Sequence, residues 1–301
     1  MNLHDQGVDE AVICAYGGAS ELKQAARGTN SMKLHFVDEP LPVGNAGCIR
    51  DAYDGDRHTV FIVLQASMMS PPDVDLLLQM CRIHKSSLTV VLGSVQPGGG
   101  PPGIAPEIYV CDPGVVEYMP AQGYFDIKEG LIPTMVKARQ IVGAVTLPRR
   151  TCCFRDGATY LAALGHWLRG DGSSGDLQSA GLVKTSQNLW QADGASIDSN
   201  VITDGPVVVM NRARITGPSV IFGPTLIEAD VSVGRDSIID SSALWGGASV
   251  GSHCHVCQSV ITHNVSVPDH SVMHQRPVFR KLENRLDVWN RILPRRKLAV
   301  V

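Results

Sequence analysis

Long apolar runs are missing from this sequence of 301 residues. No stretch approaches the roughly 18 to 20 apolar residues that a membrane-spanning helix needs, so the sequence predicts a soluble chain. The sequence also shows no secretory signal. Its eight cysteines are scattered along the chain and have no regular spacing. Scattered cysteines without a signal favour a reducing compartment, and we therefore expect a cytoplasmic protein.

An excess of charge of either sign is also lacking, since the formal net charge at pH 7 is −3. Net charge therefore implies neither nucleic acid nor an acidic polymer as a partner. Aromatic residues make up only 5% of the chain, whereas glycine occurs 30 times. Few rings and many glycines are typical of tight turns and stacked small side chains. The length itself favours about two domains.

The first half of the chain alternates predicted strands and helices. Residues 11–15 (AVICA) read as a strand, residues 19–27 as a helix and residues 32–37 as a second strand. Further along, residues 60–64 form an apolar run typical of a buried strand, residues 73–84 a helix and residues 88–95 another strand. This order is that of a parallel α/β sheet, so we expect an α/β, Rossmann-like domain over residues 1–168.

A glycine-rich turn separates two of these predicted elements. Gly44 and Gly47 flank Asn45 and Ala46 just before a helical pattern carried by Ile49 and its successors. Small residues at the start of a helix let the backbone approach a ligand where amide groups point outward. The apolar run at residues 60–64 ends where α/β sheets usually bind their ligands.

This segment resembles the sugar-phosphate nucleotidyltransferases, or NDP-sugar pyrophosphorylases. Their base-binding segment reads E-x-P-L-G-T-A-G-A-(L/I)-R-x-A, and the matching residues here are Glu39, Pro40, Gly44, Ala46, Gly47, Ile49, Arg50 and Ala52. Residues 105–111 (APEIYVC) and 125–133 (FDIKEGLIP) are similar to two further family segments. The resemblance implies a nucleotide or an NDP-sugar as ligand, bound at Gly44, Asn45, Ala46 and Gly47. We expect a bulky substitution such as Gly47→Val to abolish binding while leaving the fold intact.

The charged parts of the family's active site are replaced in this sequence. In the family a strand ends in N-G-D, whose Asp holds magnesium, and the matching residues here are Gln65, Ala66 and Ser67. Ser67 is therefore a degenerate metal position, because Mg²⁺ prefers carboxylate and phosphate oxygens to a lone hydroxyl. Asp156 is a candidate remnant of the family's second metal ligand, or alternatively the Asp of a surface Asp-Gly turn.

Two further family motifs are absent from the sequence. A turn-rich stretch at residues 97–103 (PGGGPPG) stands in place of the Glu-Lys-Pro segment, and the chain opens at Met1 without the G-x-G-x-R phosphate loop. A misplaced start, a fragment or a lost loop each explain the opening. We expect no catalytic residue and no cofactor, with magnesium needed only if residual activity exists. The hypothesis is a binding, regulatory or assembly subunit of sugar-nucleotide or surface-polysaccharide metabolism; the alternative is an active nucleotidyltransferase whose N-terminal motif is missing.

The second half of the chain carries a repeat with a period of six. Eight of the eleven positions in the series are apolar; they are Ile202, Val208, Arg214, Val220, Leu226, Ser232, Ile238, Leu244, Val250, Val256 and Thr262. A hexapeptide period predicts a parallel β-helix, here of about three and a half coils over residues 195–272. The resembling family carries such a domain in left-handed form. By composition, residues 169–194 read as a linker around the GDGSSG stretch.

The tail, residues 273–301, has the three- and four-residue apolar spacing of an amphipathic helix with a basic polar face. We expect it to cover the open end of the solenoid; the alternative is contact with a membrane surface or with a membrane-bound partner. A homo- or hetero-oligomer is the expected assembly.

Histidines and cysteines of the repeat region suggest two other functions. A hexapeptide-repeat acyltransferase would use His253, His255 or His263 as a general base. Zinc at the cluster around Cys254 and Cys257 is disfavoured, because neighbouring residues of a solenoid point alternately in and out. We therefore expect no metal site in the sequence.

Overall fold

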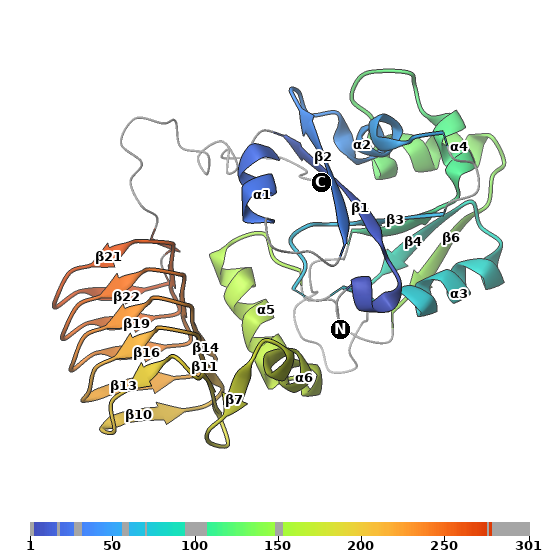
Figure 1. Ribbon diagram of the computed structural model, residues 1–301. Coiled ribbons are helices and arrows are strands. Elements are labelled where there is room, and N and C mark those ends of the chain that lie inside the picture. Colours follow the sequence, from blue (N-terminus) through green and yellow to red (C-terminus); the bar gives the residue numbers. More distant parts are fainter. Residues whose placement is uncertain are drawn as a thin grey trace. The chain divides into compact units, whose positions relative to one another are not determined.

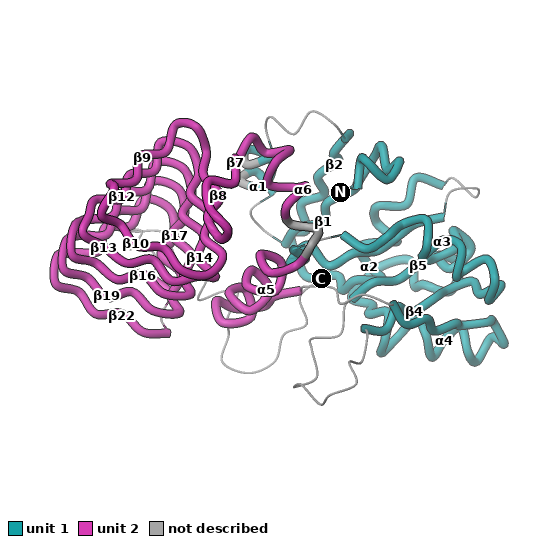
Figure 2. The backbone as a smooth tube through the Cα atoms, turned by 90° about the horizontal axis from the view of Figure 1, so that it is seen from below, with its two compact units in different colours: residues 1–151, 294–301 teal, residues 152–293 magenta. Residues whose placement is uncertain are grey.

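The computed structural model describes residues 3–16, 19–26, 32–55, 60–69, 71–93, 107–147, 153–275 and 277–278. The chain forms two compact units, and among the described residues the first unit ends at Leu147 and the second begins at Cys153 (Figure 2). The predicted fold class, an α/β region followed by a parallel β-solenoid, is confirmed. Within the described ranges, no helix is both long and apolar enough to cross a membrane.

The first unit contains ten regular helices and strands among its described residues (Figure 1). They are β1 Glu10–Tyr16, α1 Ala19–Ala25, β2 Lys33–Glu39, α2 Gly44–Ala52, β3 Phe61–Leu64, α3 Val74–His84, β4 Leu88–Leu92, β5 Ile108–Cys111, α4 Ile132–Lys137 and β6 Val142–Thr146. Three short helices accompany them: η1 His4–Gln6, η2 Pro113–Tyr118 and the π-helix η3 Ile127–Leu131.

The strands of the first unit form two sheets. β1 and β2 pair in parallel, as the strand–helix–strand order predicts. The other sheet has the order β3-β5-β4-β6, and β5 runs antiparallel to both of its neighbours while β4 and β6 are parallel. The sheet is therefore mixed rather than uniformly parallel.

Helices cover both faces of the four-stranded sheet, with α3 on one side and α2 and α4 on the other (Figure 1). Successive residues of β5 point to opposite faces: Ile108 and Val110 pack with Leu77 of α3, whereas Tyr109 and Cys111 pack with Ala46 of α2. A strand covered on both faces needs apolar residues at every position, and all four residues of β5 are buried.

The second unit begins with two helices and a short strand: α5 Gly157–Arg169, α6 Asp171–Ser179 and β7 Leu182–Lys184. Residues 157–168, which we expected at the end of the first domain, form most of α5 and belong to this unit. Tyr160 of α5 packs edge-to-face on Trp245 of the solenoid, with ring centroids 5.8 Å apart. Helix α6 occupies part of the stretch that reads as a linker, because Leu177 is buried and anchors it.

The solenoid has five turns of three strands and one further strand. The strands are β8 Leu189–Ala192, β9 Ser196–Ile197, β10 Val201–Asp204; β11 Val207–Val209, β12 Arg214–Ile215, β13 Ser219–Phe222; β14 Thr225–Ile227, β15 Ser232–Val233, β16 Ile238–Asp240; β17 Ala243–Leu244, β18 Ser249–Val250, β19 His255–Cys257; β20 Val260–Ile261, β21 Ser266–Val267, β22 Val272–His274; and β23 Pro277–Val278. The predicted three and a half coils were too few, because coils already begin at β8 and continue through β22.

The coil length changes along the solenoid. Val220 pairs with Ile238, eighteen residues later, whereas Leu226 pairs with Ala243, only seventeen residues later. Phe222 pairs with Asp240 and Leu226 with Ala243, so the three residues 223–225 of one corner are matched by only two, residues 241–242, in the next coil. A one-residue change exchanges inward and outward side chains.

The six-residue series is therefore out of phase with the core in the early coils. Ile202 and Ile238 of that series are exposed, whereas Ile221 and Ile239, each beside a member of the series, are buried. From Leu244 the series and the buried positions coincide through Val250 and Val256. The structure thus corrects the phase of the repeat while keeping its architecture.

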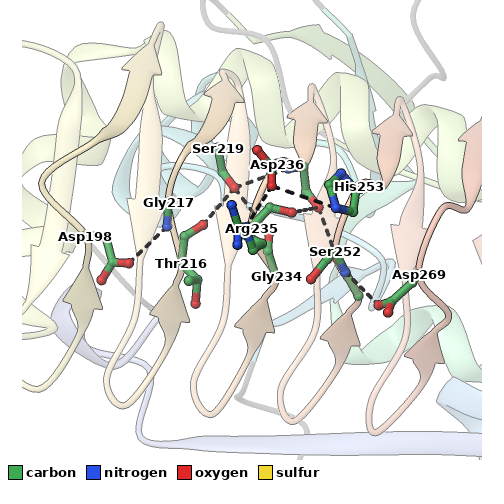
Figure 3. Close-up of polar contacts among 12 residues, drawn as sticks. Asp198, Thr216, Gly217, Ser219, Gly234, Arg235, Asp236, Ser252, His253 and Asp269 are labelled. Carbon is green, nitrogen blue, oxygen red and sulfur yellow. Dashed lines mark hydrogen bonds and ion pairs between the residues drawn. The ribbon is translucent and has the colours of Figure 1, made fainter.

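Buried hydroxyl groups satisfy the backbone at the solenoid corners. Ser237 Oγ donates to the carbonyl of Gly251 (3.0 Å) and accepts from the amide of Cys254 (3.1 Å), and Ser219 Oγ repeats the pattern one coil earlier. Carboxylates do the same on the outside: Asp198 accepts from the amide of Gly217, and Asp269 from that of Ser252 (Figure 3). These ladders give each coil a fixed register on the next.

Candidate functional site

The glycine-rich turn begins helix α2 and is buried. Asn45 Oδ1 accepts a hydrogen bond from the amide of Ile127 at 2.6 Å. Gly47 donates its amide to the carbonyl of Phe125 (3.0 Å), and Phe125 donates its own amide to the carbonyl of Val43 (2.8 Å). The segment FDIKEGLIP is therefore joined directly to the base-binding-like segment, although about 80 residues separate them in sequence.

This packing explains both glycines. Gly44 has φ +76°, and a Cβ there would lie 2.5 Å from the carbonyl oxygen of Phe125. A Cβ on Gly47 would lie 2.9 Å from Cβ of Val43. The expectation that Gly47→Val leaves the fold intact is therefore wrong, because the larger side chain has no room. Whether Gly44, Asn45, Ala46 and Gly47 also contact a nucleotide stays a prediction.

Two further polar groups hold the turn in place. Arg50, which matches the Arg of the family form that the sequence resembles, pairs with Asp51 (2.7 Å) and donates to the carbonyls of Pro120 and Gly123, both at 3.1 Å. Asp126 caps η3 by accepting from the amides of Lys128 and Glu129. Both side chains position backbone rather than project toward a ligand.

A second polar cluster lies beside the turn. Cys14 of β1, Glu39 at the end of β2 and Cys48 of α2 bring two Sγ atoms and a carboxylate oxygen within 4.8 Å of one another. It is the only such metal-ligand group among the residues that the structure describes. Glu39 and Cys48 are buried, and Oε1 of Glu39 has no hydrogen-bond partner. We expected no metal site, and no short spacing in the sequence indicated this candidate group, because its members lie on three separate elements.

The two thiols of this cluster differ in acidity. The pKa of Cys14 is lowered, because the thiol of Cys48 donates a hydrogen bond to its sulfur, an effect larger than that of burial. The pKa of Cys48 is raised far above the ordinary thiol range by the same hydrogen bond, by burial and by the carboxylate of Glu39.

Ser67 follows the end of β3 and is half-buried. Two residues earlier, Gln65 is buried, and its Oε1 has no hydrogen-bond partner. The side chains at this strand end are thus an amide and a hydroxyl, with Ala66 exposed between them. The role of Ser67 as a degenerate metal position stays a prediction.

Asp156 is the N-cap of α5. Its Oδ1 accepts from the amide of Thr159 at 2.8 Å, and the Thr159 hydroxyl accepts from the amide of Asp156, which completes a capping box. The hydrogen bonds from Thr159 lower the pKa of Asp156. This capping geometry uses the carboxylate within its own helix, and a role for Asp156 as a remnant metal ligand stays a prediction.

The three histidines named for acyl transfer have different surroundings. His253 stacks on His270, with ring centroids 4.8 Å apart, and lies 3.8 Å from a carboxylate oxygen of Asp236. His255 is exposed on β19, and His263 lies against Trp245 with its Nδ1 3.4 Å from the carbonyl of Gly246. The amphipathic tail, from residue 279 on, and the stretch at residues 97–103 lie outside the described residues.

Comparison with known proteins adds a similarity of backbone. No protein-family model matches the chain, and no curated protein matches it. A crystal structure of HddC from Yersinia pseudotuberculosis is similar over 54% of this chain and 80% of that chain, with 17% identity and a TM-score of 0.44. HddC complexed with GMP-PN gives 16% identity, the same coverage and a TM-score of 0.43. Similarities at this level do not identify a family.

Proposed function

We propose that the chain is a nucleotidyltransferase-like protein that binds a nucleotide or an NDP-sugar without turning it over. It would serve as a binding, regulatory or assembly subunit in sugar-nucleotide or surface-polysaccharide metabolism. The ligand would lie at the start of α2, where residues 44–47 form the glycine-rich turn.

One observation carries the proposal. The two segments that resemble the nucleotidyltransferases are far apart in sequence, yet Asn45 and Gly47 bond directly to Ile127 and Phe125. A chance resemblance of two short segments gives no reason for them to meet. The proposal of inactivity is supported by Ser67 in place of a metal-binding Asp and by Asp156, which is engaged as a helix cap.

Calorimetric titration with a panel of nucleoside triphosphates and NDP-sugars, with and without magnesium, tests the proposal. The same sample is assayed for pyrophosphate release from a nucleoside triphosphate and a sugar 1-phosphate. We expect binding that is independent of magnesium and no pyrophosphate. Absence of binding to every ligand would overturn the binding function, and pyrophosphate release would overturn the assignment of inactivity.

A Ser67→Asp variant sharpens the test, with Ser67→Asn as its uncharged control. A carboxylate at the end of β3 adds an oxygen ligand that Mg²⁺ prefers. We expect nucleotide affinity to become magnesium-dependent in Ser67→Asp and to stay independent of magnesium in Ser67→Asn. Equal behaviour of the two variants would mean that residue 67 does not lie near the bound phosphates.

A further inference from the structure

We propose that Cys14, Glu39 and Cys48 form a binding site for a thiophilic divalent cation, with zinc as the metal it suits best. The inference is separate from nucleotide binding, because it concerns a different set of side chains. It rests on how these three side chains converge and on the buried Oε1 of Glu39, which has no hydrogen-bond partner.

The geometry suits a tetrahedral ion. Zinc binds thiolate sulfur at about 2.3 Å and carboxylate oxygen at about 2.0–2.2 Å, so its ligand atoms lie roughly 3.5 Å apart. The ligand atoms here already lie within 4.8 Å of one another, and a small change in side-chain rotamers would bring them onto one ion. Three protein ligands leave a fourth position for water, and Cys14 is the half-buried member of the group.

Burial and charge call for a cation. Glu39 is only 8% exposed, and its Oε1 has no hydrogen-bond partner. Buried carboxylates are normally paired or bound to a metal. The negative charges of Glu39 and Asp51 both act on the sulfur of Cys14. Arg50, whose charge interacts with Cys48, is already paired with Asp51.

The donor set selects the metal. Two thiolates with one carboxylate form a mixed sulfur and oxygen set that suits zinc, whereas Mg²⁺ prefers oxygen ligands alone. A bound ion would join β1, the end of β2 and α2. Cys48 directly follows Gly47, and Glu39 directly precedes Pro40, so the ion would fix both ends of the segment that carries the glycine-rich turn.

The test uses the full chain, reduced and freed of metal with a chelator, and titrated first with Co²⁺ as a spectroscopic probe. Cobalt at this site should give sulfur-to-metal charge transfer in the near ultraviolet and the intense visible bands of a tetrahedral ion. Competition with a chromophoric chelator then gives the zinc affinity. We expect one ion per chain to bind with these signatures.

Variants locate the ion. Cys14→Ser and Cys48→Ser should each reduce the intensity of the charge-transfer band and weaken affinity at least about 100-fold, since even loss of an outer-shell partner costs 10–100-fold. Cys81→Ser and Cys254→Ser change cysteines outside the cluster, and they should leave the charge-transfer band and the metal affinity unchanged. The same spectrum in all four variants would overturn the assignment.

Glu39→Gln separates binding from folding. The amide keeps the shape of the side chain and removes the buried charge, so the metal-free protein should melt at the same or a higher temperature. Zinc should raise the melting temperature of the parent chain and have a smaller effect on Glu39→Gln. Oxidation of Cys14 and Cys48 to a disulfide in air, with no metal bound by the reduced chain, would also overturn the proposal.

Discussion

The substitution Gly44→Ala tests how closely the two nucleotidyltransferase-like segments are packed. An alanine at φ +76° loses about 1 kcal/mol for adopting the left-handed region. Its Cβ would also lie 2.5 Å from the carbonyl oxygen of Phe125 and displace it. That carbonyl accepts the amide of Gly47, and the amide of Phe125 donates to Val43, so two hydrogen bonds worth about 1 kcal/mol each are disturbed.

Gly55→Ala is the matched control. Gly55 also has a positive φ, +91°, but nothing lies within 4 Å of the Cβ that alanine would add. We therefore expect Gly55→Ala to cost about 1 kcal/mol and Gly44→Ala about 2–3 kcal/mol. The difference between the two variants isolates the close approach of Phe125 from the backbone conformation.

Urea unfolding separates the two units for this measurement. Three of the four tryptophans, Trp167, Trp190 and Trp245, lie in the second unit, and the fourth, Trp289, lies outside the described residues, so the described part of the first unit contains no tryptophan. Tryptophan fluorescence therefore reports the unfolding of the second unit. The far-ultraviolet ellipticity reports the unfolding of both units, so any change in ellipticity that occurs without a change in fluorescence is assigned to the first unit. We expect Gly44→Ala to lower the midpoint of the first unit by roughly 1 M urea, at a typical slope of about 2 kcal/mol per M. Equal shifts for Gly44→Ala and Gly55→Ala would refute the reasoning.

Three further substitutions test other contacts. Asn45→Ala leaves the backbone amide of Ile127 without its acceptor and should destabilise the first unit by about 1–3 kcal/mol in the same urea experiment. Asp156→Ala removes the helix cap bonded to Thr159 and should lower the free energy of unfolding by about 1 kcal/mol near pH 7, measured by tryptophan fluorescence. Because the folded pKa of Asp156 is lowered, this difference in stability between variant and parent should disappear as the pH falls below about 3.9, the ordinary pKa of the unfolded residue. Ser237→Ala should cost about 1–3 kcal/mol in the second unit, since it leaves the amide of Cys254 unpaired; an unchanged fluorescence midpoint would contradict the corner ladder.

Local patterns predicted the elements of the chain well. The run at residues 11–15 lies in β1, and the helix expected over residues 73–84 is α3 with Asp73 as its N-cap. These features depend on periodicity and capping within about a dozen residues, which a single sequence contains. The hexapeptide period likewise predicted the solenoid.

Contacts between distant residues were not predictable in the same way. The change of coil length depends on whether three residues (223–225) or two (241–242) join the paired positions at a corner. A constant period averages over this difference, and the phase error follows from it. Helix α5 belongs to the second unit because Tyr160 meets Trp245, and no local pattern records that contact.

The cluster of Cys14, Glu39 and Cys48 escaped sequence reasoning for a related reason. Metal motifs are recognised by short spacings, whereas these ligands come from two strands and a helix. Parallel pairing of β1 and β2, together with the position of α2, brings them together. The group can therefore be recognised only from the three-dimensional arrangement of β1, β2 and α2.

The packing of the glycine-rich turn decides which experiments can test function. Gly44 and Gly47 are required for the approach of the 125–127 segment, so any larger residue there changes stability before it changes binding. Loss of nucleotide affinity in such a variant would have two explanations. Ser67 lies at the end of β3 and is half-buried, so a change of charge there leaves the hydrogen bonds of the turn in place. A magnesium-dependent affinity gained by Ser67→Asp, at an unchanged unfolding midpoint, can therefore be assigned to ligand binding alone.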